Sequence, residues 1–416
     1  MNINRTFINL LILFFFSIII FYLLSKQLIY PTIIPMVKNG VINLFADWSA
    51  IISANICDGK GFDVYSNNPC DLWNRKHVYG KTLLYFPYIE SFPRFYFIYV
   101  PIILNLVFFY TVISFFNFKN KSEYFFLFLF LLNAPVILAI ERANIDIVIF
   151  LLIVALSKNK NLIINYLILI FTSITKFYPI SLGIIFLFEK KFKMIVINLL
   201  IFLITVSIIL FFQRDDIIKI YNNQNQFSGS GIYEFSFIGG LSFIQNMNIY
   251  FDSKNYNFIK YFYIFLTLII PLFITIYLNI RSFLNASSIS NLFLKNNFEN
   301  RLYILNSAII LVCYFSFSNF FYREIFFLGL IPWILKNRGI IENKFLNFYF
   351  YILGGKFLIS TALIYITTNN IFSNLNPFIV ITKHCIDFYL ISIVLIIFIY
   401  SLKSFFTKLF YFGNKF

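Results

Sequence analysis

A run of ionisable and amide side chains interrupts the apolar sequence at residues 141–146, which read Glu-Arg-Ala-Asn-Ile-Asp between the apolar segments 124–140 and 147–156. Charges at a helix end inside a membrane protein are costly unless they are paired or line a wet cavity, so such a run marks a candidate functional site. Lys176-Phe177-Tyr178-Pro179 places another cation and another helix break between apolar segments. Two such junctions on one side of a bilayer predict an anion-binding site.

The residue types at these junctions fit an anion. Arg142 and Lys176 supply positive charge, and an arginine can bind an oxyanion through two parallel donors. Glu141 and Asp146 are candidates to hold Arg142 in place. The alternative is that Glu141, Arg142 and Asp146 form a structural ion network that caps two helices. The sequence leaves both interpretations open.

Composition indicates the kind of element that must carry these residues. The chain is 60% hydrophobic and only 12% charged, which is more apolar surface than one soluble core can bury. We therefore expect an all-α polytopic membrane protein, with residues 1–416 forming a single integral membrane domain. The net charge of +16 is not arranged in a basic stripe, so no nucleic-acid partner is expected. His77 and His384 lack a metal-ligand context, and no metal or cofactor is expected.

Apolar runs that can cross a hydrocarbon core of ~30 Å predict about twelve membrane helices, with ten to twelve compatible with the pattern. The expected segments are 6–25, 95–117, 123–140, 145–157, 161–175, 178–188, 194–212, 257–280, 302–318, 325–335, 345–367 and 378–402. Three of them, 145–157, 178–188 and 325–335, are too short to span alone and begin at polar junctions. Lys356, Lys383, His384 and Asp387 lie in the last two segments, and we assign them no catalytic role because a lysine within a membrane helix more often snorkels.

Charge distribution predicts the orientation, because short cytoplasmic loops collect Lys and Arg. A cytoplasmic N-terminus puts most basic loops inside the cell. The polar segments 31–94, 141–146 and 213–256 then lie outside, together with Lys176 and Arg323. We therefore expect two large extracytoplasmic loops, 31–94 and 213–256, and an extracytoplasmic site.

The first loop carries its own candidate residues. Residues 41–56 predict a short interfacial helix that bears Asp47, with Ala46, Ala50 and Ala54 leaving room above the carboxylate for a bulky substrate. The alternative is an exposed helix charge. His77, in the aromatic and cationic run 73–77, is expected to lie near lipid headgroups or simply at the surface. Cys57 and Cys70 are 13 residues apart and can form a disulfide in an oxidising compartment or remain two free thiols.

These motifs, taken together, resemble the polyprenyl-phosphate-mannose-dependent mannosyltransferases of the GT-C superfamily, especially the mycobacterial phosphatidylinositol-mannoside mannosyltransferases and their bacterial relatives. The resemblance covers residues 45–193, and its most specific element is the family pattern Glu-Arg-Gly-Asn-x-Asp. Ala143 replaces the glycine of that pattern here. Residues 319–324, Asn-Phe-Phe-Tyr-Arg-Glu, resemble the late polar motif of these enzymes.

The resemblance implies a GT-C-like helix bundle in the bacterial inner membrane, with membrane lipids around it. It further implies inverting, metal-independent transfer of a sugar, mannose by the same resemblance, from a polyprenyl-phosphate donor to a lipid or glycan acceptor. Asp47 would be the general base, with Asp58, Asp63 and Asp71 as rival carboxylates. The expected donor-phosphate ligands are Arg142, Lys176 and Arg323, and the expected supporting residues are Glu141, Asn144, Asp146, Tyr178 and His77.

Other classes of protein remain open on sequence alone. A transporter or flippase of a lipid-linked or anionic substrate would also place charges at broken helices, although we find no repeated halves. A non-catalytic membrane assembly factor would need no base. An O-antigen polymerase or ligase would be expected to carry its largest outer loop in the second half of the chain, whereas here the first loop is the largest.

Overall fold

The computed structural model describes residues 9, 11–15, 17–18, 37–38, 41–42, 44–86, 88, 91–116, 118, 121–189, 191–224, 235–237, 261, 265, 286–293, 295–316, 319, 321–338, 344–368 and 376–413. The regular elements within these ranges are helices, apart from one short antiparallel ladder in which β1 (Val37–Lys38) pairs with β2 (Val41–Ile42). The expected all-α class is confirmed for this part of the chain.

Several of the described helices suit a membrane. Four are long and apolar enough to cross one, Phe95–Ile113, Phe192–Phe212, Phe345–Ile366 and Ile379–Phe405. A fifth candidate is a pair of helices, Glu123–Leu131 and Ala134–Arg142, that meet at a bend of 50°. These helices indicate an integral membrane protein. The expected count of about twelve spans is not confirmed, and the expected segments 6–25 and 257–280 lie largely outside the described residues.

The first half of the chain forms short helices that break at the polar junctions. In order they are α3 (Ala46–Gly59), η1 (Lys81–Tyr85), η2 (Phe95–Tyr99), α4 (Val100–Ile113), α5 (Lys121–Leu131), α6 (Ala134–Arg142), α7 (Ile145–Lys158), α8 (Leu162–Thr175), η3 (Tyr178–Phe188), α9 (Phe192–Phe212) and α10 (Arg214–Gln224). The helix expected at 41–56 begins only at Ala46, because Val41 and Ile42 pair in β2 and Phe45 turns the backbone with a φ of 61°.

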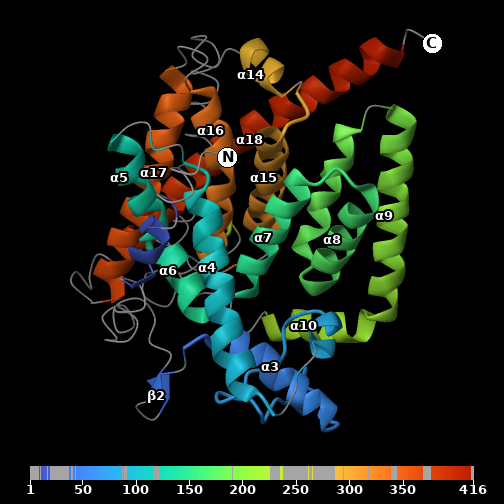
Figure 1. The fold of residues 1–416 in the computed structure, drawn as a ribbon, viewed down its shortest axis with the longest axis vertical. Helices are drawn as coiled ribbons and strands as arrows, with labels where there is room; N and C mark the ends of the chain where they lie inside the picture. The colour runs from blue at the N-terminus through green and yellow to red at the C-terminus, as the bar shows by residue number, and fades with distance from the viewer. Residues whose placement is uncertain are drawn as a thin grey trace.

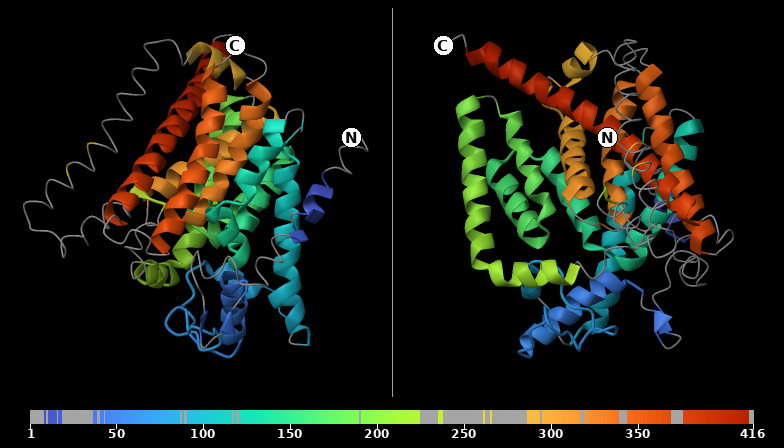
Figure 2. Two further views of the ribbon diagram at one scale, coloured as in Figure 1. Left: turned by 90° about the vertical axis from the view of Figure 1, so that its left-hand side faces the viewer. Right: turned by 180° about the vertical axis from the view of Figure 1, so that it is seen from behind.

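The second half supplies the centre of the bundle. Its elements are α14 (Ala286–Leu292), α15 (Phe298–Ser316), η8 (Phe321–Leu330), α16 (Ile331–Asn337), α17 (Lys344–Thr368) and α18 (Asn376–Gly413). Helix α15 is buried around most of its circumference and contacts η3, η8, α7 and α18. Figure 1 shows α15 inside the bundle, and Figure 2 shows α18 crossing it obliquely. Its contacts with η3 and α7 of the first half and with η8 and α18 of the second join the two halves.

Helices α3 and α10 lie across one end of the bundle (Figure 1). Lys219 Nζ of α10 lies 2.8 Å from Asp63 Oδ2, and Asn223 donates to the carbonyl oxygen of Tyr65 over 2.8 Å. Ile220 packs in the same apolar cluster as Val64 and Tyr65. The two loops expected to share a side, 31–94 and 213–256, therefore meet at this end through their described residues.

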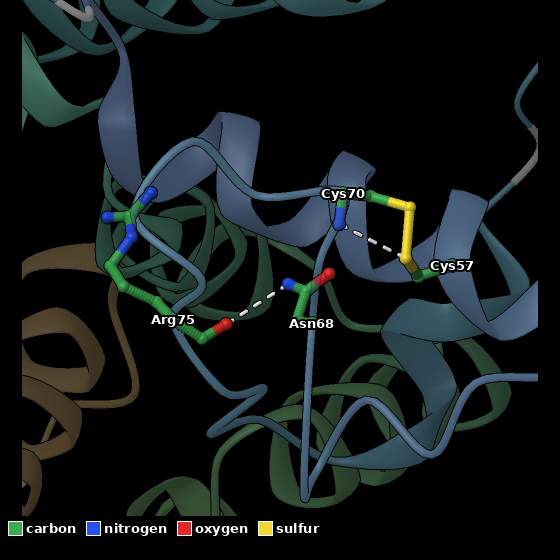
Figure 3. Close-up of a disulfide and its surroundings, with 4 residues drawn as sticks. All are labelled: Cys57, Asn68, Cys70 and Arg75. Carbon is green, nitrogen blue, oxygen red and sulfur yellow. Dashed lines mark hydrogen bonds between the residues drawn. A yellow bond between two sulfur atoms is a disulfide. The ribbon is translucent and has the colours of Figure 1, made fainter.

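A disulfide fastens the first loop to α3. The bond joins Cys57, near the end of α3, to Cys70, and the two Cα atoms are 5.8 Å apart (Figure 3). Asn68 donates to the carbonyl oxygen of Arg75 over 3.0 Å, which folds the next stretch of the loop back on itself. Closing a loop of this length removes conformational freedom from the unfolded chain and stabilises the fold by about 3 kcal/mol.

His77 lies inside this loop and not at its surface. Its side chain is 3% exposed and packs edge-on against the rings of Tyr65 and Tyr79, whose centroids are 5.3 and 5.6 Å away. The expectation that His77 meets lipid headgroups or solvent is therefore wrong. Burial disfavours the charged imidazolium and lowers the pKa of His77 to about 4.

This burial predicts a pH-dependent stability. The unfolded chain binds a proton at His77 with the ordinary pKa of 6.5, whereas the folded loop binds it only near 4. The free energy of unfolding should therefore fall as the pH drops from about 6.5 towards 4, by roughly 3 kcal/mol at most. Thermal unfolding of the wild type and of His77→Gln at neutral pH and at about pH 4.5 measures this. An equal loss of stability in both proteins would contradict the assignment.

Candidate functional site

Asp47 lies in the first turn of α3 and faces the junction between α6 and α7. Its Oδ2 accepts a hydrogen bond of 2.7 Å from the side-chain amide of Asn144. Its Oδ1 lies 3.4 Å from Nη1 of Arg75 and 3.8 Å from Nη1 of Arg142. The residue is 9% exposed, so the carboxylate is buried among polar and charged side chains and is not the freely exposed helix charge of the alternative interpretation.

Two hydrogen bonds from residues on either side of Asp47, one from a backbone N–H and one from a side chain, explain why Asp47 points to the junction. The backbone N–H of Phe45 donates to the carbonyl oxygen of Glu141 over 2.8 Å. The indole of Trp48 donates to the carbonyl oxygen of Tyr96 over 2.9 Å. The start of α3 is thereby tied to the last turn of α6 and to η2, which places Asp47 at the junction.

Arg75 is a site residue that the sequence-based assignment missed. Its Nε and Nη2 bind the two carboxylate oxygens of Asp71 at 3.0 and 2.8 Å. Its Nη2 also donates to the carbonyl oxygen of Ala46 over 2.7 Å, and its remaining nitrogen faces Asp47. The i,i+4 spacing of Asp71 and Arg75 was the one sequence pattern that could have indicated this ion pair. It points to a bidentate pair near Asp47 only when the loop is known to fold back onto α3.

Ala143 makes the sharp turn between α6 and α7. Its φ and ψ are 45° and 52°, the left-handed region that glycine adopts most easily. The N–H of Ala143 donates to the carbonyl of Ile140 over 3.0 Å, and the N–H of Asn144 donates to that of Ala139 over 2.9 Å. Such a pair of bonds commonly ends a helix at a residue in the left-handed conformation, most often a glycine. In the mannosyltransferase pattern that residues 141–146 resemble, a glycine stands at this position.

Asn144 begins α7 and joins the junction to its surroundings. Its Oδ1 accepts from the backbone N–H of Asp146 over 3.0 Å, which caps the helix, and Nζ of Lys176 lies 3.4 Å from the same oxygen. Its Nδ2 donates to Asp47. One amide side chain therefore contacts the candidate base, a helix N-terminus and a candidate phosphate ligand.

Asp146 gathers the other candidate residues. It forms an ion pair with Lys176, accepts a hydrogen bond of 2.6 Å from the Tyr178 hydroxyl, and lies 3.6 Å from Nε of Arg323. The two sequence junctions and the late motif therefore meet at one carboxylate. Arg142 lies beside Asp47, whereas we expected Asp146 to hold it, and Asp146 contacts Lys176 and Arg323 instead. Glu141 is fully buried at the end of α6.

Aromatic rings surround the cations of this cluster. Nζ of Lys176 lies 5.2 Å from the ring centroid of Tyr79 and 5.9 Å from those of Tyr178 and Tyr322. The guanidinium carbon of Arg323 lies 4.8 Å from the centroid of Tyr178. Rings at these distances favour a positive charge. Asp146 already contacts Lys176 and Arg323, and Asp47 lies beside Arg142. An incoming anion must therefore compete with these carboxylates for the cations.

The rival carboxylates of the first loop are engaged elsewhere or lie outside the cluster. Asp63 is exposed and pairs with Lys219, and Asp71 is buried against Arg75. Asp58 is half-buried near the end of α3. In the part of the chain that the structure describes, no group of three His, Cys, Asp or Glu side chains is placed to hold a metal ion.

The strained conformation of Ala143 predicts a stabilising substitution. Ala143→Gly should raise the free energy of unfolding by about 1 kcal/mol, because glycine adopts a positive φ without a steric cost. Ala139→Gly is the matched control: Ala139 is a buried helical residue of the same α6, and this change should destabilise by about 1 kcal/mol. Thermal unfolding of both variants measures the difference. A loss of stability in Ala143→Gly equal to that in the control would contradict the prediction.

Comparison with known proteins found no match: no family model, no curated protein and no solved structure matches this chain. The resemblance to the mannosyltransferases therefore depends on the motif residues alone, and function has to be argued from the cluster itself.

Proposed function

We propose that this protein is a membrane glycosyltransferase that transfers a sugar, mannose, from a polyprenyl-phosphate donor to a lipid or glycan acceptor. The observation that carries the proposal is the network in which Asn144 connects Asp47 to Lys176 and Asp146. It unites a loop carboxylate with cations from separate segments. The proposal includes a GT-C-like bundle of about twelve membrane helices in the bacterial inner membrane, with the site on the extracytoplasmic side.

Asp47 is the general base of the proposed reaction. The acceptor hydroxyl oxygen attacks the anomeric carbon of the donor sugar, and its proton passes to the Asp47 carboxylate. The bond between the anomeric carbon and the phosphate oxygen breaks, and polyprenyl phosphate leaves with the bonding electrons. The configuration inverts because the hydroxyl attacks, in a single displacement, from the face opposite the leaving phosphate. A base must lie within hydrogen-bond reach of the proton that it takes. The hydrogen bond from Asn144 holds one carboxylate oxygen and thereby orients the other.

Arg142, Lys176 and Arg323 bind the departing phosphate. Negative charge grows on the leaving oxygen during the transfer, and preorganised cations stabilise it most where water is excluded. The side chains of Arg142 and Lys176 are 8% and 7% exposed, and that of Arg323 is 15% exposed, so all three lie in such an environment. Asp146 keeps Lys176 and Arg323 in place before the donor arrives, and Tyr178 and Glu141 support them.

The phosphate assignment predicts a loss of donor affinity. Arg142→Ala or Lys176→Ala should weaken binding of a polyprenyl-phosphate sugar by ~2 to 5 kcal/mol, because a desolvated charge partner is removed. Arg142→Lys should restore only part of the affinity, since an ammonium group cannot bind a phosphate through two fixed donors. Lys219→Ala is the control, because its ion pair is exposed and is worth little.

Titration of the purified protein with donor measures these affinities. Wild-type affinity in well-folded Arg142→Ala and Lys176→Ala proteins would reject the phosphate assignment. It would favour the alternative in which Glu141, Arg142 and Asp146 form a structural ion network.

The base assignment predicts a loss of transfer without a loss of binding. Asp47→Asn should fold and bind the lipid-linked sugar, yet transfer it ~100- to 10,000-fold more slowly. Asp58→Asn, Asp63→Asn and Asp71→Asn are made in parallel, and Asp71→Asn also tests the support of Arg75. Product formation from a labelled donor measures the rate. Near-normal transfer in all four variants would reject the base mechanism, and transport of the intact donor by the wild type would favour a flippase.

A further inference from the structure

A second group of charges lies inside the bundle, on η8, α17 and α18. Lys356 forms an ion pair with Glu324 and lies 3.4 Å from Asp387. Lys383 lies 2.7 Å from Asp387 and 3.5 Å from Glu324. All four side chains are 0% exposed. We call Glu324, Lys356, Lys383 and Asp387 the buried quartet.

The quartet corrects one expectation about the last helices. Lys356 does not snorkel towards a membrane surface, because its ammonium group lies among Glu324, Asp387 and the rings of Phe327 and Phe357. Asp387 binds Lys383, one turn away on α18. The four side chains therefore place two cations and two carboxylates together inside the bundle. Three of them lie on α17 and α18, within stretches that are long and apolar enough to cross a membrane.

Such a set is poorly explained by stability alone. Moving charges from water into the protein interior commonly costs more free energy than their mutual attraction recovers. Apolar side chains of similar volume often give the same stability or more. What ion pairs do supply is a defined relative position, since each charge is stable only beside its partner. The quartet therefore constrains how η8 sits against α17 and α18.

The same helix carries two residues of the candidate site. Tyr322, Arg323 and Glu324 are consecutive at the start of η8. The Tyr322 ring lies 5.9 Å from Lys176 Nζ, and Arg323 lies 3.6 Å from Asp146, whereas Glu324 joins the quartet. Beyond them, a Cβ atom at Gly329 would lie 2.2 Å from the Asn306 side chain of α15. Helix η8 is therefore packed tightly at its far end and held by charges at its near end.

We propose that the buried quartet positions the anion site: the ion pairs of Glu324 with Lys356 and Lys383, which Asp387 also binds, set the rotation of η8 and thereby the place of the Arg323 guanidinium beside Asp146. Glu324 is a positioning residue in this scheme, because it acts through Arg323. The proposal deepens the proposed function and rests on it, since it takes Arg323 as a ligand of the donor phosphate.

The test uses the full chain in lipid nanodiscs and polyprenyl monophosphate as the probe. The double variant Glu324→Gln with Lys356→Met removes one cation and one carboxylate, so no lone charge is left buried and Lys383 still pairs with Asp387. Its affinity for the probe should fall about tenfold. The control is Glu123→Gln with Arg338→Gln, which removes another largely buried pair, 2.8 Å apart, and should change the affinity less than about twofold.

Combination with Arg323→Ala separates positioning from a general effect on the fold. If the quartet acts through Arg323, the double variant should weaken binding by less than about twofold in the Arg323→Ala background. An equal loss in both backgrounds, or no loss in the wild-type background, would overturn the proposal.

A second measurement does not depend on the donor. Backbone hydrogen exchange in residues 321–330 should become faster in the double variant, while exchange in residues 192–212 stays unchanged. If Arg323→Ala binds the probe normally, the proposed phosphate role of Arg323 fails, and exchange alone then decides whether the quartet positions η8. Unchanged exchange in residues 321–330 would overturn the positioning proposal.

Discussion

The candidate site depends on one side-chain amide, that of Asn144. Its oxygen caps α7 and lies near Lys176, and its nitrogen donates to Asp47. An amide is suited to this place because it offers an acceptor and two donors on one rigid group. Aspartate could cap the helix but would repel Asp47, and a hydrophobic residue would leave the carboxylate without this donor. Asn144 therefore couples the position of the loop helix to the position of the membrane helices.

A second constraint is the cost of charge within an apolar bundle. Each buried charge must lie beside an opposite one or a hydrogen-bond partner, and two groups of such charges bear on the candidate site. One group surrounds Asp47 and Asp146, and the other is the buried quartet. Consecutive residues of η8 belong to both groups. The arrangement of α17 and α18 is thereby linked to the residues that contact Asp146.

The loop that carries Asp47 is held from several directions. The Cys57–Cys70 disulfide closes it, and Lys219 and Asn223 of α10 bind its middle. Arg75 donates a hydrogen bond to the start of α3. Small and irregular segments have little apolar surface to bury, so they need such cross-links to keep one conformation. A candidate base on a loop is useful only if the loop holds it in place, and these contacts do so.

The sequence by itself determined the helical membrane class and most helix positions, because apolar runs of spanning length and the polar breaks between them are local properties of the chain. It also pointed to residues 141–146, Lys176 and Arg323. Only the tertiary structure decided that Asp146 binds Lys176 and Arg323 while Arg142 lies beside Asp47, that Arg75 joins the site, and that His77 and Lys356 are buried. The physical reason is that the partner of a charge depends on which distant segments pack together, and neither spacing nor composition encodes that distance.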